Sequence, residues 1–413
     1  MVEALLVVGL AVAVFVGFNI GGSSTGVAFG PAVGSNSVSK FWAATLMSGF
    51  ALLGGWTAGR EVIKTMGGKI VPATKFTLAA SVVILLFVGL ALLVSNLFGV
   101  PASTSMTAVG AIAGMGVASD SIRWEVMGGI VSWWIVAPVM AFWVCAVIGR
   151  YFYPMLATRF GVDTSTGSMF ERRHLGPIPV VWIAEGTSRR EAISAVLVVV
   201  IGCYMAFSAG ASNVANAVAP LYSISAFGDG FIVYVALGGG AIGLGAFTIA
   251  RRTLDTVGND LTDLPLLAAL IVEVVSASLI TFLSLIGIPA SLAVSATMSI
   301  VGLGWGRATR TTTITQAAGK AVKGEGATKA DGGTATEQVE ADQTQKKTVG
   351  GALQADKPGE SVAPIGEEQP EELAASDLFD PGTTGRVIGL WIITPSLSAT
   401  ASYLLFSVFP IYG

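Results

Sequence analysis

Two segments of this sequence place glycine, serine and asparagine inside long apolar runs. The first reads Gly-Gly-Ser-Ser-Thr-Gly at residues 21–26, and the second reads Gly-Ala-Ser-Asn-Val-Ala-Asn at residues 210–216. Glycine destabilises a helix interior, so we expect each segment to break a helix. The N–H groups freed at such a break, together with hydroxyl and amide side chains, favour a small anion. Close helix packing is the alternative; it explains the glycines but not the two asparagines and the row of hydroxyls.

A second pair of segments combines proline with serine. Residues 100–103 read Val-Pro-Ala-Ser, and residues 288–291 read Ile-Pro-Ala-Ser. Proline is tolerated in the first turn of a helix and serine is a preferred N-cap, so each segment predicts a helix N-terminus. Such an N-terminus offers N–H and O–H donors to an oxyanion; ordinary N-capping is the alternative. The residues that we expect to bind the anion are Ser23, Ser24, Thr25, Ser103, Thr104, Ser105, Ser212, Asn213, Asn216 and Ser291.

One carboxylate lies deep inside an apolar run. Glu273 stands within residues 264–286, where a charge is costly and marks a functional site by default. We therefore take Glu273, with Asn19, as the candidate for a coupling cation, either a sodium ion or a proton. A structural carboxylate paired with Arg251, Arg252 or another polar helix is the alternative. The two cysteines lie in separate apolar runs and the single histidine has no second ligand nearby, so we expect no metal or organic cofactor.

The elements that must position these residues are membrane spans. Hydrophobic residues make up 53% of the chain and charged residues 12%, whereas soluble domains carry about 25% charged residues. Runs of about 20 apolar residues, which are long enough to cross a bilayer, occupy residues 2–20, 41–58, 76–98, 124–148, 192–208, 231–249, 264–286 and 387–409. Shorter apolar pieces, which we expect to be half-helices or re-entrant hairpins, occupy residues 27–33, 106–117, 214–222 and 292–301.

Two polar connections separate the apolar regions. Residues 150–190 contain six arginines against three carboxylates, so the positive-inside rule places them in the cytoplasm. Residues 306–385 lack an apolar period, which predicts a disordered acidic loop. No clustered basic face indicates nucleic acid. We divide the chain into a first transmembrane repeat (1–149), a cytoplasmic connection (150–190), a second transmembrane repeat (191–305), the acidic loop (306–385) and a final transmembrane helix (386–413).

The motifs recur within the chain. The Pro-Ala-Ser segments lie 188 residues apart, and the two glycine-rich segments lie 189 residues apart. Repeated halves with interrupted helices at matching positions are typical of transporters that bind their substrate between the halves. We expect an all-α polytopic membrane protein with two structural repeats of inverted topology, containing broken helices and re-entrant hairpins. Apolar run lengths alone do not establish the inversion, because half-helices and crossings look alike.

These motifs resemble those of the inorganic phosphate transporter family. Each repeat of that family carries Gly-Ala-Asn-Asp-Val-Ala-Asn-Ala, followed later by Pro-Val-Ser-Thr-Thr-His. Residues 210–217 agree at six of the eight signature positions, and residues 28–35 are similar to the tail of the family's first copy. The resemblance implies a transporter of phosphate coupled to sodium ions or protons, held in the cell membrane, and it suggests a homodimer.

The departures from the family pattern lie at charged positions. Ser24 and Asn213 stand where the family has aspartate, and Met106 and Val294 stand where it has histidine. Phosphate near neutral pH is partly protonated and can donate a hydrogen bond to a carboxylate, whereas sulfate has no proton to donate. A site without carboxylates therefore favours sulfate. Residues 18–21 and 59–65 also look similar to a branch of the family known for sulfate uptake.

The expected function is secondary transport of a tetrahedral oxyanion, with phosphate as the family's default and sulfate as the alternative. An anion channel, in which the interrupted segments form a filter, is an alternative of another class. We do not expect the protein to be an enzyme, because no nucleophile, base and orienting group occur together in the sequence. No nucleotide-binding loop of the Gly-x4-Gly-Lys-Ser/Thr kind is present, so the chain alone is not an ATP-driven pump.

Overall fold

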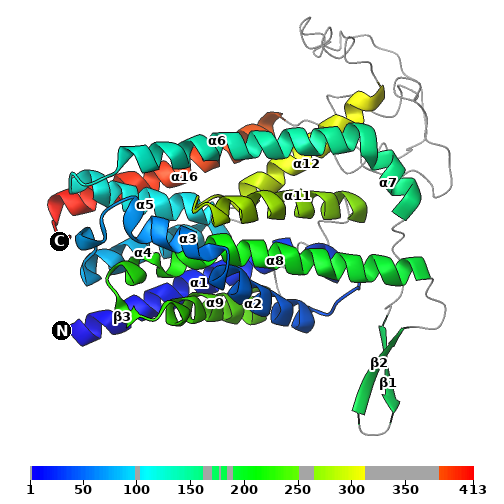
Figure 1. Cartoon of the computed structure of the whole chain (residues 1–413), viewed down its shortest axis with the longest axis horizontal. Coiled ribbons are helices and arrows are strands. Elements are labelled where there is room, and N and C mark those ends of the chain that lie inside the picture. Colours follow the sequence, from blue (N-terminus) through cyan, green and yellow to red (C-terminus); the bar gives the residue numbers. More distant parts are fainter. Residues whose placement is uncertain are drawn as a thin grey trace, which may run out of the picture.

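The computed structural model describes a bundle of membrane-spanning helices (Figure 1). It describes residues 2–97, 103–160, 170–175, 178–183, 189–250, 265–311 and 381–413. Within these ranges, six helices are long and apolar enough to cross a membrane. These are Glu3–Gly34, Trp124–Arg159, Ala192–Ser223, Phe231–Thr248, Leu266–Leu285 and Trp391–Val408. The protein is therefore a helical, multi-pass membrane protein, as its composition predicts.

The helices follow the two halves of the sequence. Those of the first half are α1 (Val2–Gly34), α2 (Lys40–Trp56), α3 (Gly59–Lys64), α4 (Leu78–Leu97), α5 (Thr104–Ala118) and α6 (Trp124–Val147). Those of the second half are α8 (Arg189–Ser223), α9 (Phe231–Thr248), α11 (Leu266–Leu285), α12 (Leu292–Ala308) and α16 (Pro381–Val408). Short helical turns are η1 (Thr65–Lys69), η2 (Ala73–Lys75), η3 (Ile148–Phe152) and η5 (Thr309–Thr311).

Helix boundaries recur at the spacing of the sequence repeat. Helices α4 and α11 each contain 20 residues, and their first residues, Leu78 and Leu266, lie 188 positions apart. Helices α5 and α12 also begin 188 positions apart. Helices α6 and α16 begin 257 positions apart, because residues 309–380 of the long polar region separate α12 from α16. The same series of helices is thus built twice.

The predicted helix breaks at the glycine-rich segments are wrong. Helix α1 continues through residues 21–26, and α8 continues through residues 210–216. The short pieces predicted at 27–33 and 214–222 are therefore parts of these long helices. The glycines allow close packing instead: a Cβ at Gly21 would overlap the carbonyl oxygen of Ile242 in α9, and one at Gly210 would overlap that of Ala51 in α2. Packing through small residues compensates for the helix-weakening effect of glycine.

These close contacts are reciprocal between the halves. A Cβ at Gly54 in α2 would overlap the carbonyl oxygen of Phe207 in α8, and one at Gly245 in α9 would overlap that of Phe18 in α1. Each pair joins one helix from the first half to one from the second. Helix α1 therefore packs on α9 in the way that α8 packs on α2.

Helices α5 and α12 are also covered by the opposite half. A Cβ at Gly114 would overlap the carbonyl oxygen of Ala399, which joins α5 to α16. A Cβ at Gly302 would overlap that of Phe142, which joins α12 to α6. The hydroxyl of Ser398 in α16 also donates to a carbonyl oxygen of α5, at 2.9 Å. Neither half buries its own short helix without the other.

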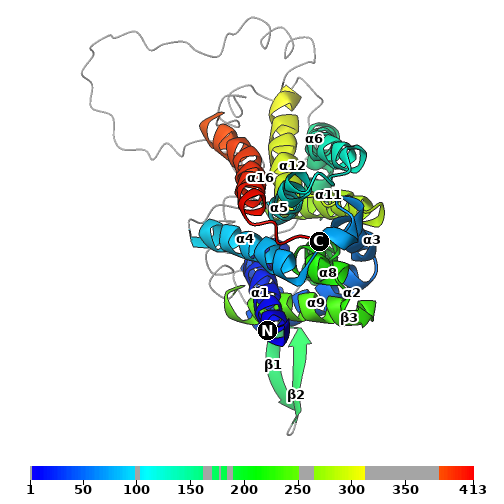
Figure 2. The same cartoon turned by 90° about the vertical axis from the view of Figure 1, so that its left-hand side faces the viewer.

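The helices form two groups, seen end-on in Figure 2. Helices α1, α2, α8 and α9 form one group, and two packed pairs, α5 with α16 and α6 with α12, form the other. Helix α4 contacts α1 and α5, and α11 contacts α8 and α12, so these two helices bridge the groups. Figure 1 shows α1 running away from the end of the bundle that holds both termini, and α8 running toward it. Helices α6 and α16 also run in opposite directions.

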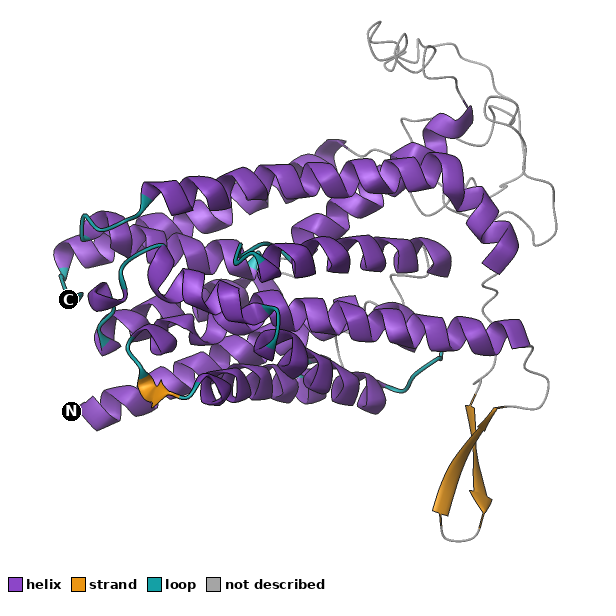
Figure 3. Ribbon diagram, in the orientation of Figure 1, coloured by secondary structure: helices purple, strands orange, loops and turns teal. Residues whose placement is uncertain are grey.

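The central connection contains structure that its polar composition did not predict. Helix α7 (Tyr153–Phe160) extends α6 beyond η3, and strands β1 (Phe170–Leu175) and β2 (Ile178–Ile183) pair in antiparallel fashion (Figure 3). A third strand, β3 (Ala226–Asp229), follows α8. In the predicted acidic loop, α12 and η5 extend to residue 311 and α16 begins at residue 381. The remainder of that loop lies outside the described residues.

Candidate anion-binding site

Two short helices begin inside the bundle at the predicted Pro-Ala-Ser segments. The hydroxyl oxygen of Ser103 accepts a hydrogen bond from the backbone N–H of Met106, at 3.4 Å, at the start of α5. That of Ser291 accepts one from the N–H of Val294, at 3.3 Å, at the start of α12. The predicted helix N-termini are confirmed, and both serines act as N-caps, as the alternative interpretation held. Pro101 lies outside the described residues.

A tight turn separates α11 from α12. Gly287 adopts φ +77°, a left-handed conformation that glycine adopts without strain. The N–H groups of Gly287 and Ile288 donate to carbonyl oxygens in the last turn of α11, at 3.0 and 2.8 Å, which is the usual way to close a helix C-terminus. The chain then reverses within a few residues, and α12 starts near the end of α11 (Figure 1).

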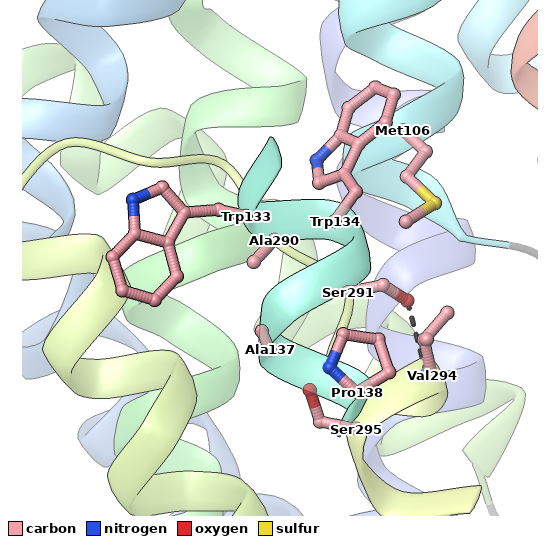
Figure 4. Close-up of a pocket in the computed structure, with 9 residues that line it drawn as sticks. All are labelled: Met106, Trp133, Trp134, Ala137, Pro138, Ala290, Ser291, Val294 and Ser295. Atoms are coloured by element: carbon pink, nitrogen blue, oxygen red, sulfur yellow. Dashed lines mark hydrogen bonds between the residues drawn. The ribbon is translucent and has the colours of Figure 1, made fainter. Parts of the chain in front are cut away.

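The N-termini of α5 and α12 meet at one pocket, shown in Figure 4. It is small, with a cavity volume of about 10 Å³, and it is lined by Met106, Trp133, Trp134, Ala137, Pro138, Ala290, Ser291, Val294 and Ser295. Met106 lies in the first turn of α5, and Val294 lies in the first turn of α12. The lining contains no charged side chain. Two helix N-termini therefore face this pocket, and the positive ends of their dipoles favour an anion over a cation.

Ser295 supplies a free hydroxyl to the pocket. Its side chain is 2% exposed and lies one turn after the N-cap of α12. No hydrogen bond of its hydroxyl is seen among the described residues, so the hydroxyl is available to a ligand in the pocket. A bound oxyanion would give this hydroxyl an acceptor. Sequence reasoning did not include Ser295 among the anion-binding residues.

Trp134 holds the start of α12 in place. Its indole N–H donates a hydrogen bond to the carbonyl oxygen of Pro289, at 2.8 Å. Sequence reasoning missed this residue, although a signal is present. Residues 134–138 read Trp-Ile-Val-Ala-Pro and residues 391–395 read Trp-Ile-Ile-Thr-Pro, 257 positions apart. The motif escapes a search at the 188- to 191-residue spacing because the acidic loop separates its second copy from the rest of the repeat.

Four predicted residues gather where α8 meets α5. The amide group of Asn216 donates to the hydroxyl of Ser105, at 3.1 Å, and to the amide oxygen of Asn213, at 3.0 Å. Asn216 is 1% exposed and Asn213 is 7% exposed. The side-chain oxygens of Asn216 and Ser212 are buried and have no hydrogen-bond partner in the described part of the chain. The second copy of the signature thus contacts the first copy of the Pro-Ala-Ser segment.

The matching segment of α1 does not join this cluster by any recorded hydrogen bond of the described residues. The hydroxyl of Ser23 donates to the carbonyl oxygen of Asn19, at 3.2 Å, and that of Thr25 donates to Gly21, at 2.6 Å. Both hydroxyls therefore satisfy carbonyls of their own helix. Ser24 is half-buried without a recorded hydrogen bond, and Thr104 is half-buried in the first turn of α5.

Both candidates for the coupling cation are buried. Glu273 in α11 is 5% exposed, and its Oε1 atom has no hydrogen-bond partner within the residues that the structure describes. Recorded ion pairs in the described ranges join Glu61 to Lys64 and Lys69, and none involves Glu273. The amide group of Asn19 donates to the carbonyl oxygen of Phe15, at 2.8 Å. Arg251 and Arg252, the alternative partners of Glu273, lie outside the described residues.

Metal-ligating side chains do not cluster in the part of the chain that the structure describes. No group of three or more His, Cys, Asp or Glu side chains could hold a metal ion there. Cys145 and Cys203 are both buried and unpaired with each other. The chemistry of the pocket and of the Asn216 cluster is that of neutral hydrogen-bonding groups.

Comparison with known proteins identifies the family. The phosphate transporter family matches residues 20–402, which include both signatures, both Pro-Ala-Ser segments and most of α16. The chain belongs to the phosphate transporter family. The resemblance predicted from the signatures is confirmed. As a member of this family with six candidate spans, the protein is a multi-pass protein of the cell membrane.

Within the family, individual relatives differ in the ion that they are named for. The sulfate permease CysP of Bacillus subtilis (strain 168) is 30% identical over 293 residues, which cover 70% of this chain and 74% of that protein. A solved structure of a sodium-dependent phosphate transporter has a TM-score of 0.63 at 17% identity and covers 98% of this chain and 100% of that one. That structural likeness shows the fold.

Proposed function

We propose that this member of the family is a cation-coupled secondary transporter of sulfate. The observation that carries the choice of ion is the neutral Asn213–Asn216–Ser105 cluster. Asn213 occupies the position of the family's aspartate, and its amide oxygen accepts a hydrogen bond from Asn216 at 3.0 Å. Buried neutral donors suit an ion without a proton, whereas a carboxylate there would repel it and would suit protonated phosphate.

Phosphate is the second candidate. The family description and the solved structure both refer to phosphate, and both ions are tetrahedral. The printed name of the Bacillus relative supports sulfate. The loss of carboxylate from both signatures, at Ser24 and Asn213, favours the same ion.

The proposed anion site joins the pocket to the Asn216 cluster. Ser291, Ser295 and the first N–H groups of α12 approach the anion from one side, and Ser105, with the first turn of α5, approaches from another. Asn213, Asn216 and Ser212 complete the site from α8. On α1, Ser24 is the residue that we retain, because its hydroxyl has no recorded partner among the described residues. Ser23, Thr25, Ser103 and Thr104 then position the helices rather than bind the ion.

We further propose that the two halves form an inverted repeat that works by alternating access. The opposite directions of α1 and α8, and of α6 and α16, support the inversion (Figure 1). The α11–α12 reversal inside the bundle supports a re-entrant hairpin in the second half. The two groups of helices bridged by α4 and α11 could then move relative to each other about a site between them.

Transport by proteoliposomes tests this function. The purified protein is reconstituted, and uptake of labelled sulfate and of labelled phosphate is measured with no gradient, with a sodium gradient and with a proton gradient. We expect saturable sulfate uptake that a cation gradient drives, together with counterflow of sulfate. Uptake of neither ion contradicts the proposal, preference for phosphate contradicts the choice of ion, and unitary currents indicate a channel.

A further inference from the structure

Helix α3 and turn η1 lie along α8, beginning at the depth of the proposed anion site. A Cβ at Gly59, the first residue of α3, would lie 2.8 Å from the carbonyl oxygen of Ala211, the residue before Ser212. A Cβ at Gly67 in η1 would lie 3.2 Å from the carbonyl oxygen of Ala219. Helix α8 runs toward the end of the bundle that holds both termini (Figure 1), which the positive-inside rule predicts to face the outside. The segment therefore extends from the depth of the site toward the outer surface.

The same segment contacts the turn that leads into α12. A Cβ at Gly287 in this turn would lie 2.8 Å from the hydroxyl oxygen of Thr65 and 3.2 Å from the carbonyl oxygen of Glu61. Ser291, the N-cap of α12, follows four residues later. The segment thus adjoins α8 and the start of α12, which both contribute to the proposed anion site.

Two lysines of this segment share one carboxylate. The Nζ atom of Lys64 lies 2.6 Å from one oxygen of Glu61, and that of Lys69 lies 3.2 Å from the other. The lysine side chains are 43% and 48% exposed, and that of Glu61 is 38% exposed. Ionisable groups within a membrane face water or the bundle interior, because contact with lipid is costly. The half-exposed charges therefore indicate that water reaches them beside the α11–α12 turn.

Positive charge exceeds negative charge along this segment. Residues 59–70 contain three basic side chains against one acidic side chain. Arg60 lies over the ring of Phe231, 4.6 Å from its centroid, and Arg123 of the α6 start donates to the carbonyl oxygen of Gly68, at 3.2 Å. Basic residues are disfavoured on the outer side of a membrane, so their concentration here calls for a function. Clustered positive charge attracts anions from solution.

Helix packing does not demand lysine at these positions, as the second half of the sequence shows. At a spacing of 191 residues, the two halves carry opposite charges: Arg252 matches Glu61, Asp255 matches Lys64, and Asp260 matches Lys69. The three residues of the second half lie outside the described residues. The repeat therefore preserves charge at these positions but not its sign. The basic character belongs to the first half alone.

We propose that Lys64 and Lys69 bind the anion on its way between the outer solution and the proposed site, and that Glu61 holds the two lysines when no anion is present. The inference rests on the proposed function. The ligand is a tetrahedral oxyanion with two negative charges, which can contact two ammonium groups at once. Exposed ion pairs are weak, so the anion can displace Glu61 and can later leave the lysines for the site. No covalent bond forms or breaks.

Removal of each charge tests the proposal by the sign of its effect. Uptake of labelled sulfate, with phosphate in parallel, is measured in proteoliposomes for wild type, Glu61→Gln and the double variant Lys64→Gln with Lys69→Gln. The double variant should raise KM by about three- to tenfold at low ionic strength, with a smaller change in the maximal rate. Glu61→Gln should lower KM, because the lysines lose their internal competitor.

Ionic strength separates anion attraction from a structural role. The same assays are run with about 0.01 M and about 1 M choline gluconate on both sides of the membrane, where the Debye length is about 30 Å and about 3 Å. Both changes in KM should shrink at the higher salt. Changes of the same sign in the two variants, or changes that salt does not reduce, contradict the proposal and indicate an ordinary helix ion pair.

Charge rescue tests the side from which Lys64 is reached. In intact cells that express Lys64→Cys, an impermeant methanethiosulfonate reagent attaches either an ammonium or a sulfonate group to the thiol. The ammonium should restore the lower KM, and the sulfonate should raise KM further. The native Cys145 and Cys203 are buried and should not react. Absence of reaction from outside, or equal effects of the two reagents, overturns the assignment.

A matched control removes a different lysine from the same end of the bundle. The carbonyl oxygen of Lys75 accepts a hydrogen bond from the N–H of Gly413, at 3.3 Å, which places Lys75 beside the C-terminus. Lys75→Gln should leave KM unchanged, and an effect equal to that of the double variant assigns the attraction to the whole face and contradicts a specific site. Thermal unfolding shows whether each variant is folded; if the double variant is not, Glu61→Gln and the Lys64→Cys rescue still decide. Failure of the wild-type protein to move either anion instead rejects the proposed function.

Discussion

Two neutral side chains occupy the positions at which the family carries charge. Asn213 lies in the buried cluster with Asn216, and Ser24 is its counterpart on α1. A carboxylate at either place would repel a dianion without a proton and would accept a hydrogen bond from protonated phosphate. We therefore propose that ion choice depends on the charge of a side chain rather than on its size.

Restoring both carboxylates tests this dependence. In Ser24→Asp with Asn213→Asp, we expect the ratio of phosphate to sulfate uptake to rise by about tenfold, which corresponds to ~1.4 kcal/mol. The matched control is Ser24→Asn, which enlarges the side chain without adding charge and leaves both sites neutral. An equal shift in the control assigns the effect to side-chain volume. No shift in the double variant removes the charge argument for sulfate.

Trp134 is a single side chain that positions the start of α12. Trp134→Phe keeps an aromatic ring but removes the N–H that donates to Pro289, so the start of α12 should loosen. We expect a loss of about 0.5–1.5 kcal/mol in the free energy of unfolding, and a higher KM for the anion with a smaller change in the maximal rate. Trp133→Phe is the control, because Trp133 lines the same pocket without a recorded hydrogen bond. Equal effects of the two substitutions would refute a specific role for the hydrogen bond.

At the scale of helices, close packing explains why α1 and α8 remain continuous. Their glycines contact backbone atoms of α9 and α2, and the reciprocal glycines of α2 and α9 contact α8 and α1. Small residues let helix backbones approach in a bilayer, where van der Waals contact drives association. The four helices therefore form a unit whose separation is set by glycine.

Two glycines of α2 provide a matched test of this packing. Gly54→Ala places a methyl group against the carbonyl oxygen of Phe207, whereas a methyl group at Gly49 meets nothing within 4 Å. We expect Gly54→Ala to destabilise the protein by about 1–3 kcal/mol, as overpacking does. Gly49→Ala should be neutral or stabilise by up to ~1 kcal/mol, because alanine favours helix. Thermal unfolding in detergent measures both, and a neutral Gly54→Ala would contradict close packing at this helix pair.

At the scale of the whole molecule, both termini lie at one end of the bundle and α7 lies at the other (Figure 1). By the positive-inside rule, the six arginines of the central connection predict that the α7 end lies in the cytoplasm. Both termini should therefore face the outside of the cell. Helices of each half pack against helices of the other half, α1 on α9 and α8 on α2. This reciprocal packing fits two halves of opposite orientation.

Cysteine labelling tests this orientation. Glu3→Cys lies near the start of α1, and Met155→Cys lies in α7, where Met155 is 50% exposed. The native Cys145 and Cys203 are buried and should give little background. In intact cells, a membrane-impermeant maleimide should label Glu3→Cys but not Met155→Cys, and it should label both after permeabilisation. Labelling of Met155→Cys alone in intact cells would reverse the orientation.

Local patterns in the sequence were sufficient for the membrane spans, the repeat and the family. Apolar runs predict spans because a bilayer demands a minimum helix length. The N-termini at Ser103 and Ser291 were predictable because capping depends on residues within one turn. Glu273 was recognised because a carboxylate within a long apolar run is rare. These features depend on neighbours in the chain. Within the described residues, six of the eight predicted spans are helices long enough to cross a membrane, whereas those predicted at 41–58 and 76–98 are not among them. Both predicted N-termini are present.

Contacts between distant residues were decided only by the tertiary structure. From the sequence alone, Gly21 and Gly210 suggest a break in the helix, because glycine weakens a helix interior. In the structure, the backbone of a neighbouring helix packs against each glycine, and both helices remain continuous. The meeting of Met106 with Val294 at one pocket, and of Ser105 with Asn216, joins segments more than 100 positions apart. Composition and spacing identified candidate groups for binding a small anion, but only helix packing between the halves determined which of them lie together.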